Sequence, residues 1–151
     1  MKPFSSIEDV LAFAINAEQE AVDFYYRLSN QSDNTEMKQI FKQYAHEEMG
    51  HKAQLLKVRE QGLFELPSGQ VNDLKISDYL SDVLPGPDMT YTEALIMAMK
   101  KEKAAFRLYL DLAGIAVNEE IRKIFNSLAQ EEARHKLRFE IEYDEMILKQ
   151  N

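Results

Sequence analysis

Residues 125–136 read FNSLAQEEARHK, and residues 41–52 read FKQYAHEEMGHK. In each stretch a glutamate precedes a histidine by three residues, as Glu132 precedes His135 and Glu48 precedes His51. This spacing places both side chains on one face of an α-helix, one turn apart. Apolar residues recur on the same two faces at intervals of three and four, namely Phe41, Ala45 and Leu55, and Phe125, Leu128 and Phe139. Both pairs are therefore predicted to point into a helical core.

The two stretches belong to a longer internal repeat. A shift of 84 residues, from Glu48 to Glu132, also places AINAEQEAVDFY (14–25) on AMKKEKAAFRLY (98–109). Glu18 then matches Glu102, and the helix-capping residues Ser6 and Asn34 match Thr90 and Asn118. Helices with similar core patterns can align by chance, but core packing does not favour matching glutamates and histidines. The repeat therefore predicts a duplicated helical hairpin, with one copy at 6–61 and the other at 90–148.

The segment between the hairpins differs in composition from both. Residues 62–89 hold three of the four prolines, and only one short helix is expected there, near 76–83. At about 3.3 Å per extended residue, such a connection can travel the length of a bundle, so the third helix would start at the same end as the second. We expect an all-α fold, a four-helix bundle with one long crossover, and a single domain over residues 1–151.

The composition of the chain argues against several classes of function and partner. The chain has 151 residues and a formal net charge of −8, which argues against nucleic acid or an anionic membrane as the main partner. The absence of cysteine excludes disulfides, thiolate metal sites and cysteine nucleophiles within this chain. The sequence has no apolar run of signal-peptide or membrane-spanning type. We therefore expect a cytoplasmic protein.

The repeat predicts a metal site in the bundle core. Four ionised glutamates in an apolar interior would cost many kcal/mol unless they were neutralised. Two divalent cations would supply the opposite charge, and carboxylate with imidazole suits Fe, Mn, Zn or Co. One glutamate from each of two helices, plus Glu-x-x-His from the other two, is the arrangement of dinuclear carboxylate bundles. This sequence fits it at six positions, which are Glu18, Glu48, His51, Glu102, Glu132 and His135.

Other polar residues near these positions have less direct roles. Tyr25 and Tyr109 lie two turns after Glu18 and Glu102, so they are core tyrosines, partners of the glutamates or redox groups. Glu47 and Glu131 lie about 100° around the helix from the metal face, either at the surface or behind the ligands. His46 is expected on another face, exposed to solvent.

The stretches AINAEQEAVDFY with HEEMGH, and AMKKEKAAFRLY with QEEARH, resemble the rubrerythrin branch of the ferritin-like di-iron carboxylate family. The resemblance covers nearly the whole chain except 63–89. It implies that the six residues bind two irons, with Glu48 and Glu132 bridging or flanking the metals. Rubrerythrins also carry a rubredoxin-like domain with four cysteines, which this chain lacks, and an extra carboxylate near the third-helix ligand. Here Met99 and Ala105 flank Glu102.

The resemblance implies an oxidoreductase that reduces peroxide or O2 at a non-haem dinuclear iron site. Electrons would come from a separate donor protein such as a rubredoxin. Three alternatives remain open: a ferroxidase or iron-handling protein that oxidises Fe(II), a di-iron oxygenase acting on an organic substrate, and a helical module without catalysis. Manganese or zinc could replace iron. The resemblance also implies a homodimer.

Overall fold

The computed structural model describes residue 4 and residues 6–62, 74–80 and 89–150. Four long helices account for most of them: α1 (Ile7–Gln31), α2 (Thr35–Gln61), α4 (Tyr91–Ile115) and α5 (Glu119–Gln150). A short 3-10 helix, η1 (Ile76–Tyr79), lies between α2 and α4, within the predicted 76–83, of which residues 81–83 lie outside the described part. No β-strand occurs among the described residues, so the expected all-α class is confirmed.

Polar caps set the helix boundaries. The side chains of Ser6, Asn34 and Thr90 each accept a hydrogen bond from the backbone N–H three residues later, which satisfies a donor that the helix leaves free. Glu93 completes a capping box with Thr90. At the end of α2, Gly62 adopts φ 61°, a left-handed conformation that glycine takes without a Cβ clash. These local signals explain why the sequence predicted the helix ends well.

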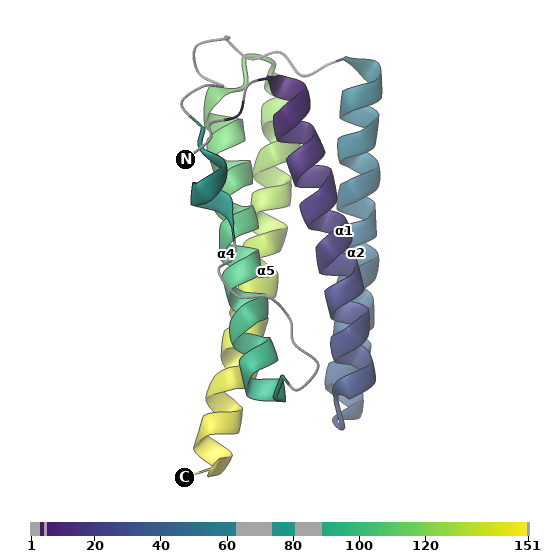
Figure 1. Cartoon of the computed structure of the whole chain (residues 1–151), viewed down its shortest axis with the longest axis vertical. Coiled ribbons are helices and arrows are strands. Elements are labelled where there is room, and N and C mark those ends of the chain that lie inside the picture. The colour runs from purple at the N-terminus through teal and green to yellow at the C-terminus, as the bar shows by residue number, and fades with distance from the viewer. Residues whose placement is uncertain (1–3, 5, 63–73, 81–88, 151) are drawn as a thin grey trace.

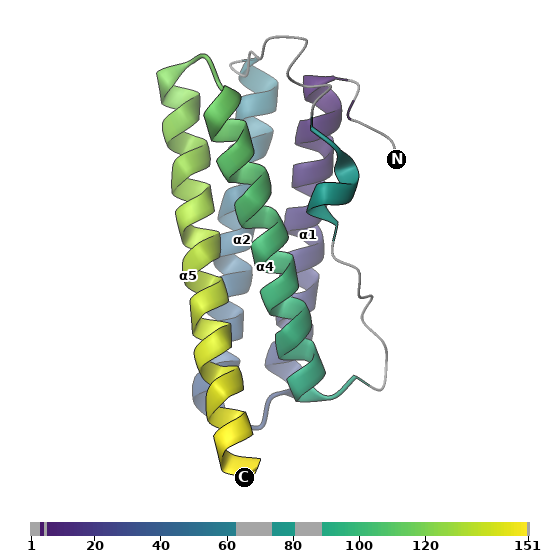
Figure 2. The ribbon, with the colours of Figure 1, turned by 90° about the vertical axis from the view of Figure 1, so that its left-hand side faces the viewer.

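The four helices form a bundle in which α2 and α4 run in the same direction (Figure 1). Within each hairpin the two helices are antiparallel neighbours, and Figure 2 shows α4 and α5 in front with α1 and α2 behind. The described part of the connection, with η1, lies alongside α4 between the two ends of the bundle. The third long helix thus begins at the same end as the second, as the long crossover predicted.

Two hydrophobic clusters fill the bundle, one toward each end. The first holds residues from the beginning of α1 and the end of α4, and the second holds residues from the end of α1 and the beginning of α4. Along every helix the predicted metal-site residues fall between the two: on α1, Ala14 belongs to the first cluster, Glu18 follows, and Ala21 belongs to the second. The bundle therefore places a polar layer between two apolar halves. None of its described helices is long and apolar enough to cross a membrane.

Candidate metal centre

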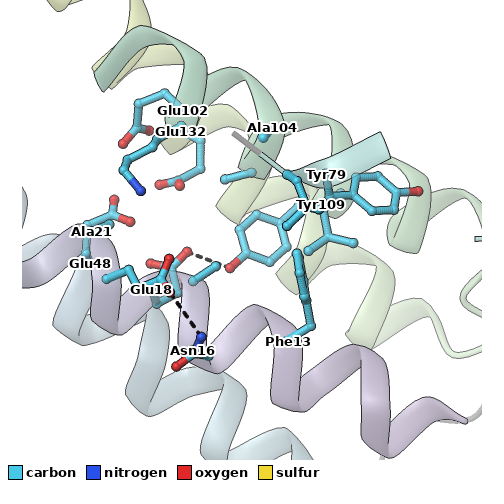
Figure 3. Close-up of a pocket in the computed structure, with 16 residues that line it drawn as sticks. Phe13, Asn16, Glu18, Ala21, Glu48, Tyr79, Glu102, Ala104, Tyr109 and Glu132 are labelled. Carbon is cyan, nitrogen blue, oxygen red and sulfur yellow. Dashed lines mark hydrogen bonds between the residues drawn. The ribbon is translucent and has the colours of Figure 1, made fainter. Parts of the chain in front are cut away.

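The structure brings all six predicted site residues into this middle layer, and we call them the central cluster. Their exposed fractions lie between 0% and 4%, although every one is a glutamate or a histidine. One glutamate comes from α1, one from α4, and a Glu-x-x-His pair from each of α2 and α5: Glu18, Glu102, Glu48 with His51, and Glu132 with His135. Figure 3 shows the four carboxylates gathered on one side of a cavity.

The central cluster divides into two overlapping groups. Glu18 and His51 form one group and Glu102 and His135 the other, while Glu48 and Glu132 belong to both. Within each group, one nitrogen or oxygen atom from each residue lies within 4.8 Å of all the others. Two positions that share two carboxylates are the geometry that a dinuclear centre requires.

The buried polar atoms give the strongest indication that these residues form a metal-binding set. Among the described residues, seven buried side-chain nitrogen or oxygen atoms lack a hydrogen-bond partner, and all seven belong to the central cluster. They are Glu18 Oε2, both carboxylate oxygens of Glu48, His51 Nδ1, Glu102 Oε2, Glu132 Oε1 and His135 Nδ1. Buried polar groups are almost always paired, because an unpaired one costs about 1–3 kcal/mol. These atoms are oriented for a shared ligand instead.

The Nδ1 atoms of the two histidines face the carboxylates at short range. His51 Nδ1 lies 3.2 Å from a Glu132 oxygen and 3.4 Å from a Glu18 oxygen. His135 Nδ1 lies 3.1 Å from a Glu48 oxygen and 3.5 Å from a Glu102 oxygen. None of these contacts has hydrogen-bond geometry, since both Nδ1 atoms lack a hydrogen-bond partner. Each imidazole therefore points one nitrogen at the centre of its group.

The other nitrogen of each histidine contacts a glutamate from the opposite hairpin. His51 Nε2 on α2 lies 2.8 Å from Glu131 Oε2 on α5, and His135 Nε2 on α5 lies 3.2 Å from Glu47 Oε1 on α2. A carboxylate acceptor at Nε2 places the ring proton there and leaves Nδ1 free to bind a metal. The sequence left two locations open for Glu47 and Glu131, at the surface or behind the ligands. The structure places both glutamates behind the histidines.

Two buried tyrosines contact the remaining glutamates, again across the hairpins. The Tyr109 hydroxyl of α4 donates a hydrogen bond to Glu18 Oε1 of α1 at 2.6 Å. The Tyr25 hydroxyl of α1 donates to Glu102 Oε1 of α4. Burial and nearby carboxylates raise the pKa of both phenols well above 10, so each keeps the proton that it donates. Both tyrosines are thus partners of the glutamates, one of the roles left open above.

Tyr44 is a contact that the sequence reasoning missed. Its ring stacks on the His135 imidazole, with ring centroids 3.8 Å apart and planes inclined by 20°. The repeat gives no hint of it, because Leu128 is its counterpart in the second hairpin. The spacing offered a signal, since Tyr44 lies four residues before Glu48 and hence on the same helix face.

Three of the four carboxylates in the central cluster, those of Glu48, Glu102 and Glu132, hold protons more tightly than an exposed glutamate does. Burial, followed by the charges of Glu102 and Glu18, raises the pKa of Glu132 to about 8. Burial and the neighbouring carboxylates raise the pKa of Glu48 well above its usual value, and burial also raises the pKa of Glu102. Burial alone would raise the pKa of Glu18 as well, but contacts with His51 and Glu48 outweigh it, and the pKa is lowered.

The same carboxylates raise the pKa of the two histidines. Burial alone would lower the pKa of His51, but Glu132 and Glu18 outweigh it and raise the pKa to about 11. Glu102 does the same for His135, whose pKa rises to about 9. Without cations, the cluster therefore binds extra protons to balance its negative charge. Metal ions would take their place and release them.

His46 lies outside the central cluster, as expected. It is exposed, and its ring makes an edge contact with Tyr26, with the centroids 6.2 Å apart. Met99 and Ala105, on either side of Glu102, are partly buried and pack against the two apolar clusters. The described residues thus fit two metal ions, because the unpaired atoms, the convergent geometry and the carboxylate–imidazole donor set all favour divalent transition metals.

The fold and the site define a class of protein: a four-helix bundle with a dinuclear carboxylate–histidine centre. Comparisons with known proteins agree. The family model described as Rubrerythrin matches residues 9–80 and 93–151. The chain therefore belongs to the rubrerythrin family, within the ferritin-like fold.

Two solved structures are similar over most of their length. One is a protein from Thermotoga maritima, described as a proposed ferritin-like diiron-carboxylate protein. It is 25% identical, with a TM-score of 0.77, over 97% of this chain and 99% of that one. The other, a hypothetical protein from Pyrococcus furiosus, is 26% identical, with a TM-score of 0.75, over 92% and 89% of the two chains. A search of curated proteins finds no significant match.

Proposed function

We propose that this protein is a di-iron carboxylate oxidoreductase that reduces hydrogen peroxide or O2. The observation that carries the proposal is the convergence of seven buried, unpaired donor atoms from four helices into two groups that share Glu48 and Glu132. The six residues of the central cluster would hold the metal ions. Bound iron would supply redox chemistry, because it cycles between the ferrous and ferric states.

The contribution of the chain is to fix the donor atoms. Glu131 and Glu47 hold the histidine rings from behind, so that both Nδ1 atoms face the centre. Tyr109 and Tyr25 hold one oxygen each of Glu18 and Glu102, which leaves the other oxygen of each free. The apolar clusters border the layer toward both ends of the bundle, so much of its surroundings is apolar. Donor atoms that are already held in position need little rearrangement during the reaction, which keeps the free-energy cost of reorganisation low.

The electrons must come from outside the chain. Reduction of peroxide to two molecules of water consumes two electrons and two protons. The chain has no cysteine and hence no thiolate-bound iron or redox disulfide of its own. We therefore include a separate electron-donor protein in the proposal. Because both hairpins supply three residues to the same centre, we also propose that residues 1–151 form one domain.

The first experiment is to measure the metal content of protein purified without chelators, beside a Glu48→Ala/Glu132→Ala double variant. We expect about two irons per chain in the wild type and loss of both in the variant, because the two substitutions remove the shared carboxylates. Rapid oxidation of the reduced protein by peroxide would then support the proposed reaction. Absence of metal, or equal metal in the variant, would refute the dinuclear site.

The same preparation separates the alternatives. A ferroxidase or iron-handling protein would oxidise many Fe(II) ions per chain, whereas the proposed enzyme would consume peroxide or O2 with an external reductant and leave its own irons in place. A helical module without catalysis would keep its fold on metal removal and have no redox-dependent spectrum.

A further inference from the structure

A cavity of about 250 Å³ opens beside the central cluster, between α1 and α4. Glu18, Glu48, Glu102 and Glu132 lie at its inner end, and each is at most 2% exposed. The lining also includes exposed residues, Asn16, Glu20 and Leu80, which form the mouth, so the cavity leads from solvent to the centre. Figure 3 shows the carboxylates on one side of this space, with Phe13, Tyr79 and Tyr109 on the other.

The wall between the two ends is apolar. Four alanines leave the space open, and aromatic and aliphatic side chains complete the wall: Ala17, Ala21, Ala104 and Ala105, then Phe13, Tyr79, Leu108 and Tyr109. The hydroxyls of both tyrosines are already engaged, that of Tyr79 by Asp111 at 2.8 Å and that of Tyr109 by Glu18 at 2.6 Å. A molecule in this part of the cavity would therefore meet methyl groups and ring faces.

The volume exceeds what the proposed oxidants need. O2 and hydrogen peroxide each have only two heavy atoms, and a water molecule accounts for about 30 Å³ of liquid. An apolar cavity of about 150 Å³ is enough to bind benzene. The space beside the centre is thus large enough for a molecule of about this size.

Charges at the mouth give no preference for an ion. Lys101 and Glu20 carry opposite charges, and the Asn16 amide donates a hydrogen bond to Glu20 at 3.2 Å. At the inner end, two divalent cations would balance the four carboxylates. Apolar walls between two nearly neutral ends favour an uncharged ligand, because a charged one would lose its hydration without gaining a partner.

We propose that this cavity binds a small, uncharged organic molecule with an apolar body, about the size of a substituted benzene, directly beside the central cluster. The molecule would lie along the alanine-lined wall, with one end next to Glu18 and Glu102. This binding site rests on the cavity itself and does not depend on the redox reaction proposed above.

The test is binding of fluorobenzene to the full chain as purified, followed by ¹⁹F NMR. Two substitutions place a larger side chain in the cavity, Ala105→Leu on α4 and Ala17→Leu on α1. The matched control is Ala12→Leu, which makes the same change at an exposed position of α1 outside the cavity. We expect saturable binding in the wild type and in Ala12→Leu. Each cavity variant should bind about tenfold more weakly, equivalent to about 1.4 kcal/mol.

Circular dichroism and metal content, measured on the same samples, separate this inference from the proposed function. A chain that carries two irons but does not bind fluorobenzene refutes the cavity site alone. A chain that binds fluorobenzene but carries no metal refutes the proposed function alone. Wild-type affinity in a folded Ala105→Leu variant would also overturn the cavity site.

Discussion

The two sides of the central cluster differ in how they are built. On the α2/α5 side, His51 and His135 point inward, and Glu131 and Glu47 contact them from behind. On the α1/α4 side, only Glu18 and Glu102 approach the centre, and alanines beside them leave a cavity. The difference teaches that α2 and α5 supply most of the converging donor atoms, whereas α1 and α4 supply one glutamate each and leave a space beside them.

The largest expected effect tests the α2/α5 side of the central cluster. A His51→Ala/His135→Ala double variant should lose both metals, because each substitution removes the inward nitrogen of one group. On the α1/α4 side, the Ala105→Leu variant should keep about two metals per chain, because the substitution removes no donor atom. Elemental analysis of the purified proteins measures this contrast, and circular dichroism confirms that the helices remain. Equal metal loss in both variants would break the comparison.

The second prediction concerns pH. In the folded metal-free chain, burial and neighbouring carboxylates raise the pKa of Glu132 from 4.5 to about 8. The folded state therefore binds this proton more tightly than the unfolded state, which stabilises the fold. This stabilisation is complete below pH 4.5 and is lost as the pH rises through 8. For His135, the contribution is complete below 6.5 and lost as the pH rises through about 9. The lowered pKa of Glu18 acts in the opposite direction, but only at acidic pH below 4.5.

We therefore expect the melting temperature of the metal-free chain to fall between about pH 5 and pH 9, and its metal affinity to rise over the same range. Differential scanning calorimetry with and without chelator checks the first trend, and competition with a chromophoric chelator checks the second. A metal-free chain that grows more stable with rising pH would contradict the pKa assignments.

The third prediction concerns the contacts behind the histidines. Glu47→Gln and Glu131→Gln should each weaken metal binding about 10- to 100-fold, because an outer carboxylate orients the imidazole and increases its basicity. Glu140→Gln on α5 is the matched control, since Glu140 pairs with Lys136 at the surface and lies outside the central cluster. Chelator competition gives the affinities. If all three variants bound metal equally well, Glu47 and Glu131 would have no role in positioning.

The fourth prediction concerns the two buried tyrosines of the α1/α4 side, Tyr25 and Tyr109. Tyr109→Phe and Tyr25→Phe should each lower the free energy of unfolding by about 1–3 kcal/mol, because each leaves a buried carboxylate oxygen without its donor. Tyr26→Phe, at a surface position, should stay within about 0.5 kcal/mol of the wild type. Urea unfolding measures the free energy for all three variants. If Tyr109→Phe left it unchanged, the hydrogen bond to Glu18 would contribute nothing to stability.

The smallest expected effect is in the wall of the cavity. Tyr79→Phe removes the hydrogen bond from η1 to Asp111 on α4 and should lower the free energy of unfolding by about 1 kcal/mol. Metal content should not change, because Tyr79 contacts the cavity and not the donor atoms. Thermal unfolding together with elemental analysis tests both expectations, and loss of metal would show that the two sides are coupled.

The sequence predicted the helices and the members of the central cluster because both depend on local spacing. Caps such as Thr90 and Asn34 act within one turn, so their effect can be read from neighbouring residues. The Glu-x-x-His spacing fixes a helix face in the same way, and the repeat at 84 residues identified which faces meet. The positions of Glu18 and Glu102 followed from that repeat.

Only the tertiary structure decided how side chains meet across helices. Glu47 lies about 100° from the metal-site face of its own helix, and it reaches His135 because α5 passes close enough on that side. Tyr44 stacks on the same ring, whereas Leu128 takes its place in the second hairpin. The cavity likewise depends on which residues of α1 and α4 face each other, since alanines leave a space only where no larger side chain fills it from the other helix. Periodicity fixes the direction of a side chain, but packing fixes what it meets.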